Sequence, residues 1–458
     1  MPVETTLVVL GVSGDMASRL LLPALGQLLH REPEHRITLI GSDTKDWTDE
    51  HFRDVVRAAF AGAGATGAAV RRVAEHATYR TADATSADDL RALLHGVRGR
   101  IALYFALPPA VAEASCVALG DVDLPEGTML ALEKPFGTDA NSAERLNEVL
   151  ARLVPENQVF RVDHFLGRST ILNLLGIRFA NRALEPVWNG QEVESVVIRY
   201  DEQLGLEGRA GYYDRAGALV DMIQSHLLQA LAFVAMEPPA TLDEVDLRDA
   251  TAAVLRATRV WEDDPAQSSR RARYTAGRIG RRKMPSYVDE PGVDPARKTE
   301  TLAEATFEVA TARWAGVPFT LHSGKAIGDP RREMVLRFRP VSHLPQGFTG
   351  DAPGAVLRFS LAPDQFSLEL NVNGGEDPFH LHRDVMDTNL GQGSTLAYSE
   401  VLDGILSGDP TLAVRGDAAV QCWRIVQPIL DAWAGDEVPL DEYAAGSEGP
   451  EGWTPLPV

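Results

Sequence analysis

The stretch TLVVLGVSGDMASRLLLPALGQLLH, Thr6–His30, predicts the first structural elements of this chain. Its first residues are apolar and rich in β-branched side chains, which is typical of a buried strand. The glycine-containing turn GVSGDMA follows directly, and the leucines after it recur at helical spacing. Glycine at such a turn lets the backbone approach a pyrophosphate, and the free N–H groups of a helix start favour its charge. The spacing is G-x-x-G-x-x-A rather than G-x-G-x-x-G, so a plain strand–helix turn stays an alternative.

Strand and helix patterns continue to alternate up to about residue 160. Short apolar runs predict further strands, and amphipathic helical patterns lie between them. This alternation predicts βαβ units and therefore a parallel sheet. The expected strands are Ile37–Asp43, Ala77–Asp83, Arg100–Leu107 and Gly127–Pro135.

The pattern changes after His164. From Glu192 onward, longer runs alternate apolar and polar residues, which suits a large antiparallel sheet with one exposed face. We therefore predict an α/β domain at 1–168 with a Rossmann parallel sheet, and an α+β domain at 169–458 built on a large antiparallel sheet. Helices are expected within the second part at 220–236, 242–256, 399–407 and 417–433.

Composition excludes several classes of protein. The chain has 458 residues, too many for one compact core, so two domains are expected. A net charge of −21 argues against nucleic acid or an anionic membrane as the main partner. Cys116 and Cys422 are too few for a disulfide framework or a four-thiolate zinc site, and a reduced cytoplasm is the simplest setting. Met1–Leu10 does not read as a signal peptide, and no window reaches the roughly 18 continuous apolar residues of a spanning helix.

Two histidines stand out as candidates for chemistry. RVDHFLGR, Arg161–Arg168, places Asp163 and His164 beside a cation, a combination that can serve proton transfer and anion binding. His226 lies in the apolar stretch DMIQSHLLQALAFVAM, where a lone histidine is more often a satisfied core residue than a catalyst. A carboxylate partner would hold its ring in one tautomer and stabilise the imidazolium, and Asp163 is the candidate.

Residues that end the predicted strands face the edge where ligands bind in open α/β sheets. Asp43 can accept hydrogen bonds from a ribose 2′-hydroxyl and would repel a 2′-phosphate; the alternative is an ordinary turn residue. Lys134, in EKPFG, would place a cation where cofactor and substrate meet; the alternative is an exposed turn lysine. A tight turn there tolerates a cis peptide before Pro135. The basic stretch Ser269–Lys283 is interpreted as a solvated loop and strand rather than an anion site.

Together these motifs resemble the glucose-6-phosphate dehydrogenase family nearly end to end. The resemblance rests on GVSGDMASRLLLPAL, EKPFG, RVDHFLGR, EGRAGYYDRAGALVDMIQSHLLQ, WAGVPFTLHSGKA, VRGDAAVQCWRIVQPILDAWA and AGSEGP. It implies oxidation of glucose 6-phosphate at C1 to the lactone, with hydride transfer to NAD(P) and no metal, as in glucose metabolism through the pentose phosphate pathway. It also implies a cytoplasmic homodimer, or dimer of dimers, that forms through the large sheet.

The resemblance further implies a role for each matched residue. His226 corresponds to the base that takes the proton of the O1 hydroxyl, Asp163 to the carboxylate that orients this base, and Lys134 to a residue between cofactor and substrate. Substrate contacts are implied for His164, Arg168, Glu202, Asp221, Lys325 and Arg331. Cofactor contacts are implied for Gly11, Ser13, Gly14, Asp15, Met16, Asp43, Asp83, Pro108 and Lys134.

The chain departs from the family pattern mainly where the substrate phosphate would bind. Leu20 stands in place of a lysine, Phe165 in place of a tyrosine, and Arg168 replaces a lysine with a different donor geometry. Pro330 stands where a second cation is usual, with Arg331 one residue later. The substrate alternatives are therefore glucose 6-phosphate, another sugar phosphate or an unphosphorylated sugar. Further departures are Ser225, Val220 and Ala362.

The cofactor loop also departs from the family pattern. In GSDTK, Thr44 stands where NADP-using members carry an arginine, and Asp43 precedes it. Both features favour NAD, while Lys45 could soften the repulsion of a 2′-phosphate. A different class of function is a catalytically silent paralogue that binds nucleotide and regulates a partner. Retention of Asp163, His226 and Lys134 argues against that class.

Overall fold

A computed structural model describes residues 4–375, 377–390 and 397–453. The chain divides into two compact units that are interleaved along the sequence. The first unit contains Met1–Arg168, Pro239–Ala252 and Ser394–Trp423, and the second contains Ser169–Pro238, Ala253–Gly393 and Arg424–Val458. The first break therefore falls after Arg168, and two later segments return to the first unit.

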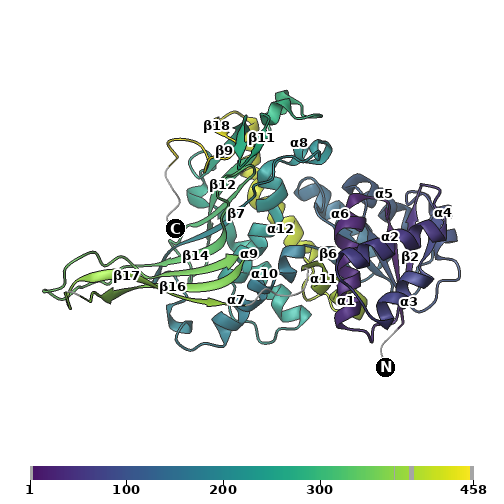
Figure 1. Cartoon of the computed structure of the whole chain (residues 1–458), viewed down its shortest axis with the longest axis horizontal. Helices are drawn as coiled ribbons and strands as arrows, with labels where there is room; N and C mark the ends of the chain where they lie inside the picture. The colour runs from purple at the N-terminus through teal and green to yellow at the C-terminus, as the bar shows by residue number, and fades with distance from the viewer. Residues whose placement is uncertain (1–3, 376, 391–396, 454–458) are drawn as a thin grey trace. The chain divides into compact units, whose positions relative to one another are not determined.

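The first unit is built on a six-stranded parallel sheet in the order β3-β2-β1-β4-β5-β6 (Figure 1). This is the strand order of dinucleotide-binding Rossmann folds and confirms the predicted α/β architecture. All residues of β1 are buried, as expected for a strand covered on both faces. The strands are β1 Thr5–Leu10, β2 Ile37–Asp43, β3 Thr78–Thr81, β4 Arg100–Phe105, β5 Met129–Glu133 and β6 Val159–Val162.

Helices pack on this sheet through their apolar stripes, and α11 packs against α1 in the same core. Thr48 and Ser86 cap α2 and α4 by accepting backbone N–H groups, which explains where these helices begin. The helical segments are η1 Ala17–Leu21, α1 Leu22–Arg31, α2 Asp49–Gly62, α3 Ala68–His76, α4 Ala87–Leu94, α5 Pro109–Leu119, α6 Ala140–Leu153, η2 Glu156–Gln158, η3 His164–Gly167 and α11 Ala397–Ser407. Two further helices, α10 Glu244–Ala257 and α12 Gly416–Ala434, begin in the first unit and end in the second.

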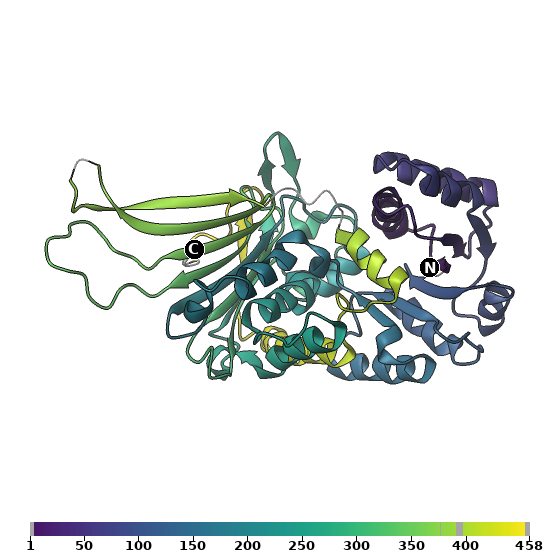
Figure 2. The same ribbon diagram turned by 90° about the horizontal axis from the view of Figure 1, so that it is seen from below.

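The second unit contains a ten-stranded sheet whose main path is β17-β16-β15-β14-β7-β13-β12-β9-β18, with β8 pairing β12. The sheet is mostly antiparallel, as predicted, but the pairs β7–β13 and β9–β18 are parallel. Figure 2 shows its green strands running on past the helices of this unit. The strands are β7 Val193–Asp201, β8 Thr258–Val260, β9 Ser269–Thr275, β12 Leu302–Val309, β13 Phe319–Gly324, β14 Arg332–Phe338, β15 Val356–Leu361, β16 Asp364–Asn373, β17 Leu381–Asn389 and β18 Leu440–Ala444.

Helices and short turns complete this unit. The basic stretch of the sequence forms β9 and the hairpin of β10 Gly277–Ile279 and β11 Arg282–Met284. The remaining helical segments are α7 Ser169–Phe179, η4 Glu185–Val187, α8 Ala210–Ala218, the π-helical η5 Leu219–Leu227, α9 Leu228–Ala235, η6 Trp261–Asp263, η7 Tyr287–Asp289 and η8 Pro295–Arg297.

The run Ala210–Ala235, which joins α8, η5 and α9, is long and apolar enough to cross a membrane by length and composition alone. However, 89% of its most apolar window is buried inside the protein. Core helices pass the same test, so this run is weak evidence for a membrane span.

Candidate active site

The glycine turn after β1 lies at the carboxyl edge of the parallel sheet. Gly11 has a φ of +81°, and a Cβ at this position would lie 2.4 Å from the carbonyl oxygen of Ala106. Only glycine fits such a crowded, left-handed position, so the backbone itself forms the cradle that a pyrophosphate requires. The residues present therefore fit a dinucleotide. Predicted cofactor residues that follow in this turn are Ser13, Gly14, Asp15 and Met16.

Asp43 ends β2 and is tied to the glycine turn. One carboxylate oxygen accepts hydrogen bonds from the backbone N–H and hydroxyl of Ser13, at 3.2 and 2.7 Å. The other accepts the N–H of Thr44 at 2.7 Å. Burial alone would raise the pKa of Asp43, but these hydrogen bonds hold it below its ordinary value. Asp43 is therefore ionised near neutral pH and also has a structural role in holding the turn.

Three more predicted cofactor residues follow neighbouring strands at the same edge. Exposed Asp83 follows β3, and hydrogen bonds from the N–H and hydroxyl of Thr85 lower its pKa. Pro108 follows β4 and stands at the N-cap of α5. Lys134 follows β5, and the Lys134–Pro135 peptide is cis, as predicted. Because all these strands are parallel, their carboxyl ends bring the predicted cofactor residues to one edge.

A carboxylate that the sequence analysis did not single out lies beside Lys134. Glu133 accepts a hydrogen bond from the Tyr104 hydroxyl and a longer one, 3.4 Å, from the Tyr398 hydroxyl. Burial raises the pKa of Glu133 to about 7, although the Tyr104 hydroxyl and the Lys134 ammonium oppose the shift. The ring of Tyr398 also stacks on His164, with centroids 5.0 Å apart. Tyr398 thus joins Glu133 to a predicted substrate residue.

RVDHFLGR forms the short helical turn η3 after β6, with His164 in the turn, Asp163 at its N-cap and Arg168 at its C-cap. Asp163 is fully buried, and its carboxylate accepts the N–H of Phe165 at 3.0 Å. The guanidinium of Arg168 lies 4.7 Å from the centroid of the Phe165 ring. Phe165 therefore supports the cation at 168 by a cation–π contact, which a hydroxyl-bearing tyrosine could also provide.

Predicted substrate residues gather in the second unit around a buried lysine. Lys325, 4% exposed, forms an ion pair with Glu202, and its Nζ lies 3.9 Å from an Asp221 carboxylate oxygen. The same ammonium lies 4.9 Å from the centroid of the Tyr213 ring. Glu202 follows β7, Lys325 follows β13, and Asp221 lies in η5. This arrangement places a cation beside two hydrogen-bond acceptors, and their contact with a sugar stays a prediction.

His226 lies further along η5 and is 2% exposed. Exposed Arg331 precedes β14, and its N–H donates to the Asp201 carboxylate at 3.3 Å. Asp163 belongs to the first unit and His226 to the second. The pairing of these two residues therefore stays a prediction.

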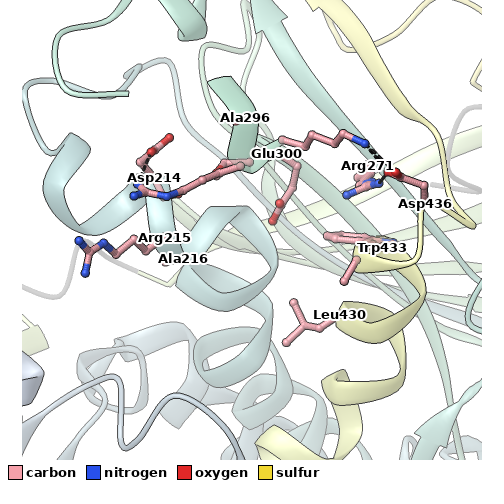
Figure 3. Close-up of a pocket in the computed structure, with 13 residues that line it drawn as sticks. Asp214, Arg215, Ala216, Arg271, Ala296, Glu300, Leu430, Trp433 and Asp436 are labelled. Atoms are coloured by element: carbon pink, nitrogen blue, oxygen red, sulfur yellow. Dashed lines mark hydrogen bonds and ion pairs between the residues drawn. The ribbon is translucent and has the colours of Figure 1, made fainter. Parts of the chain in front are cut away.

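A pocket of about 580 Å³ opens elsewhere in the second unit (Figure 3). None of the predicted site residues lines it. Two of its cations have partners: the guanidinium of Arg297 lies 2.7 Å from Asp214, and the ammonium of Lys298 lies 2.6 Å from Asp436. The pocket is therefore not assigned to the site.

Both halves of the chain match models of one protein family. The model "Glucose-6-phosphate dehydrogenase, NAD binding domain" matches residues 8–173, and "Glucose-6-phosphate dehydrogenase, C-terminal domain" matches residues 175–456. The model of the first half thus places NAD(P) binding in the Rossmann fold, as predicted.

Full-length relatives agree with the family models. Glucose-6-phosphate 1-dehydrogenase of Gluconobacter oxydans (strain 621H) is 37% identical, covering 98% of this chain and 95% of that protein. Glucose-6-phosphate 1-dehydrogenase 2 of Mycobacterium tuberculosis (strain ATCC 25618 / H37Rv) is 35% identical, covering 97% and 91%.

Solved structures give the same result. The crystal structure of glucose-6-phosphate 1-dehydrogenase from Mycobacterium avium superposes with a TM-score of 0.86 at 32% identity, covering 98% of this chain and 96% of that one. A glucose-6-phosphate dehydrogenase in complex with its substrate glucose-6-phosphate also gives 0.86, at 28% identity and coverage of 99% and 97%. With both family models matched and full-length relatives above 30% identity, the chain belongs to the glucose-6-phosphate dehydrogenase family.

Proposed function

We propose that this chain oxidises glucose 6-phosphate at C1 to the 6-phosphogluconolactone and transfers the hydride to NAD(P). The observation that carries the proposal is the buried Lys325 ammonium between Glu202 and Asp221, on the unit that also bears His226. An ammonium held by two carboxylates is fixed in position. It can donate to hydroxyl or phosphate oxygens, while the two carboxylates can accept hydrogen bonds from sugar hydroxyls.

The roles proposed for the residues follow from what the oxidation requires. His226 accepts the proton of the O1 hydroxyl as the C1 hydride leaves, and Asp163 supports the imidazolium that results. Nicotinamide, when bound, accepts the hydride. Lys134 holds substrate against the cofactor end, while Glu202 and Asp221 accept hydrogen bonds from sugar hydroxyls. Rigid placement of these groups supplies most of the catalytic advantage, because the reaction needs close alignment and one base.

The substrate phosphate is proposed to bind His164, Arg168, Lys325 and Arg331. Arginine is always charged and can bind two phosphate oxygens at once, so Arg168 and Arg331 retain anion affinity where the family pattern changes. The stacking of His164 on Tyr398 supports this role, because it fixes the orientation of the imidazole.

A panel of sugars tests the proposed substrate. Glucose 6-phosphate, glucose and other aldose phosphates are each assayed with NAD and with NADP by reduced-nicotinamide absorbance. We expect kcat/KM for glucose 6-phosphate to exceed that for glucose by at least about 10²-fold, since lost charge-assisted hydrogen bonds each cost roughly 1.5–3 kcal/mol. Equal turnover without the phosphate would refute the substrate, and no turnover of any sugar would favour the silent-paralogue alternative.

We also propose that the chain forms a homodimer, or a dimer of dimers, through the outer strands of the large sheet. Most of β17 is exposed, with Val385 at 52% and Met386 at 56% exposure. A long edge strand with exposed apolar side chains is normally covered in the functional state. A reduced cytoplasm remains the proposed location of this assembly.

Light scattering after size-exclusion chromatography tests the assembly. We expect at least twice the chain mass of 49.7 kDa for the unmodified protein. Met386→Asp should shift the population towards the monomer, because a buried unpaired carboxylate destabilises an interface. Val117→Asp is the matched control, since Val117 is 58% exposed on α5 of the first unit. A monomeric unmodified protein, or equal effects of the two variants, would contradict the proposal.

A further inference from the structure

A row of charged side chains crosses adjacent strands of the large sheet. Arg270, Glu304, His322 and Arg199 occupy positions that are in register on β9, β12, β13 and β7. Glu333 on β14 continues the row, because it is in register with Arg199. Such cross-strand neighbours lie close enough for their charges to interact directly.

His322 joins two carboxylates within this row. Its Nδ1 is 3.0 Å from an oxygen of Glu304, and its Nε2 is 3.2 Å from an oxygen of Asp201. Arg270 donates its Nε–H to Glu304 at 2.9 Å, and Arg199 forms an ion pair with Asp201. The imidazole ring is therefore held from both sides by anions, each of which also binds an arginine.

Burial makes these charges depend on one another. Asp201 is 0%, His322 4% and Glu304 7% exposed. Burial alone would lower the pKa of His322, but Asp201 and Glu304 raise it above its ordinary value. The pKa values of Asp201 and Glu304 are lowered in turn, despite burial, chiefly by His322. A buried ion is stable only with such partners, so loss of the imidazolium leaves two carboxylates undercompensated.

Asp201 connects the row to the predicted substrate residues. Its carboxylate accepts the N–H of Arg331 at 3.3 Å, and its own N–H donates to the Arg331 carbonyl at 2.8 Å. Arg332 donates its Nε–H to the Asp201 carbonyl at 3.0 Å. Glu202 follows directly, and its N–H donates to the carbonyl of Gly324, the residue before Lys325, at 2.8 Å. The three predicted substrate residues Glu202, Lys325 and Arg331 therefore lie on backbone segments that are hydrogen-bonded to Asp201 or to the residue that follows it.

We propose that His322, in its protonated form, is a positioning residue for the sugar-phosphate site. It fixes Asp201 between the strands and thereby sets the positions of Glu202, Lys325 and Arg331. This role rests on the proposed function, because it concerns the substrate of that reaction. It acts through other residues, so it affects substrate affinity rather than proton or hydride transfer.

Two substitutions test the role by separating charge from size. In His322→Gln the charge is lost, and we expect KM for glucose 6-phosphate to rise about tenfold, since small misplacements of binding groups have large effects. The values of kcat and of KM for the nucleotide should stay within about twofold. In His322→Arg the charge is kept, and KM should stay within about threefold of the unmodified value. His95→Gln, at an exposed position directly after α4, is the matched control.

The pH profile gives an independent readout. Protonated His322 holds Asp201 in place at low pH, and this effect is lost as the pH rises through the raised pKa of His322. Asp201 and Glu304, with lowered pKa values, stay ionised over pH 6–9, so only the imidazole of the row changes charge there. We expect KM for glucose 6-phosphate to rise on the alkaline side in the unmodified protein, and the rise to be smaller in His322→Arg, where His164 and the other proposed phosphate contacts are unchanged.

The outcomes separate this inference from the proposed function. If the unmodified protein oxidises no sugar, the proposed function fails, and the role of His322 fails with it. If it is active but His322→Gln matches it in KM, or kcat falls as much as KM rises, only the positioning role is overturned. Should His322→Gln fail to fold, the His322→Arg profile decides: an alkaline rise in KM as large there as in the unmodified protein overturns the inference.

Discussion

Replacing His226 with asparagine is expected to lower kcat for glucose 6-phosphate oxidation by about 10²–10⁴-fold, the usual contribution of a positioned general base. The amide cannot accept a proton at neutral pH, so the O1 hydroxyl must lose its proton to water while hydride leaves C1. Asparagine keeps a polar side chain of similar size, which limits the damage at a position that is only 2% exposed.

Initial rates with saturating sugar and nucleotide measure this effect. KM for the sugar should change by less than about threefold, because an interaction made only in the transition state affects kcat rather than ground-state binding. His76→Asn is the matched control, since His76 is an exposed residue at the end of α3. Thermal unfolding shows that the variant is folded at the assay temperature. A folded His226→Asn enzyme with unchanged kcat would exclude His226 as the base.

The parallel sheet of the first unit could be predicted because most of its strands are short, apolar and followed by a helical pattern. The sixth strand, β6, was not among the predicted strands. β1 is completely buried, and the apolar run LVVL that follows its two threonines indicates this in the sequence. The direction of pairing in the second unit was harder to infer. Alternation of apolar and polar residues reports which face is buried, but it does not distinguish the parallel pair β7–β13 from its antiparallel neighbours.

The helix around His226 shows a second limit of sequence patterns. Residues 220–236 were expected to form one helix, and the structure has the π-helical segment η5 followed by α9. Residues in this region are almost all buried, so there is no polar stripe from which the helical period could be measured. The extra residue per turn of a π-helix therefore leaves no signal in the sequence.

Motifs identified the residues near strand ends, but not the partners that hold them. Glu133 lies inside EKPFG, so its position was visible, whereas Tyr398 lies 265 residues away and belongs to no motif that suggests the contact. The same is true of Asp201, His322 and Glu304, which sheet pairing brings together. Long-range register decides such contacts, and a local pattern carries no information about it.

Asp43→Asn combined with Thr44→Arg is expected to change the ratio of kcat/KM for NADP to that for NAD by about 10²-fold in favour of NADP. We propose that the unmodified protein prefers NAD, because the Asp43 carboxylate would face a 2′-phosphate as a like charge. Unit charges about 4 Å apart interact by roughly 1–4 kcal/mol near a protein surface, and about 10²-fold corresponds to ~2.7 kcal/mol.

The choice of asparagine follows from the contacts of Asp43. Its carboxylate accepts hydrogen bonds from Ser13 and Thr44, so a change to alanine would release the glycine turn and lower the affinity for both nucleotides. Asparagine keeps one acceptor oxygen for Ser13, and the guanidinium at 44 supplies a partner for the phosphate. Because the pKa of Asp43 is lowered, its charge and the preference for NAD should both persist unchanged over pH 6–9.

Asp54→Asn removes an equal charge from an exposed position on α2 and serves as the control. If the effect came from net charge alone, this variant would change the NADP to NAD ratio as much as Asp43→Asn does. If Asp43 served only to hold the turn, the double variant would weaken NAD and NADP binding together and leave their ratio unchanged. A preference for NADP in the unmodified protein would refute the proposed role directly, because the 2′-phosphate would then bind despite the carboxylate.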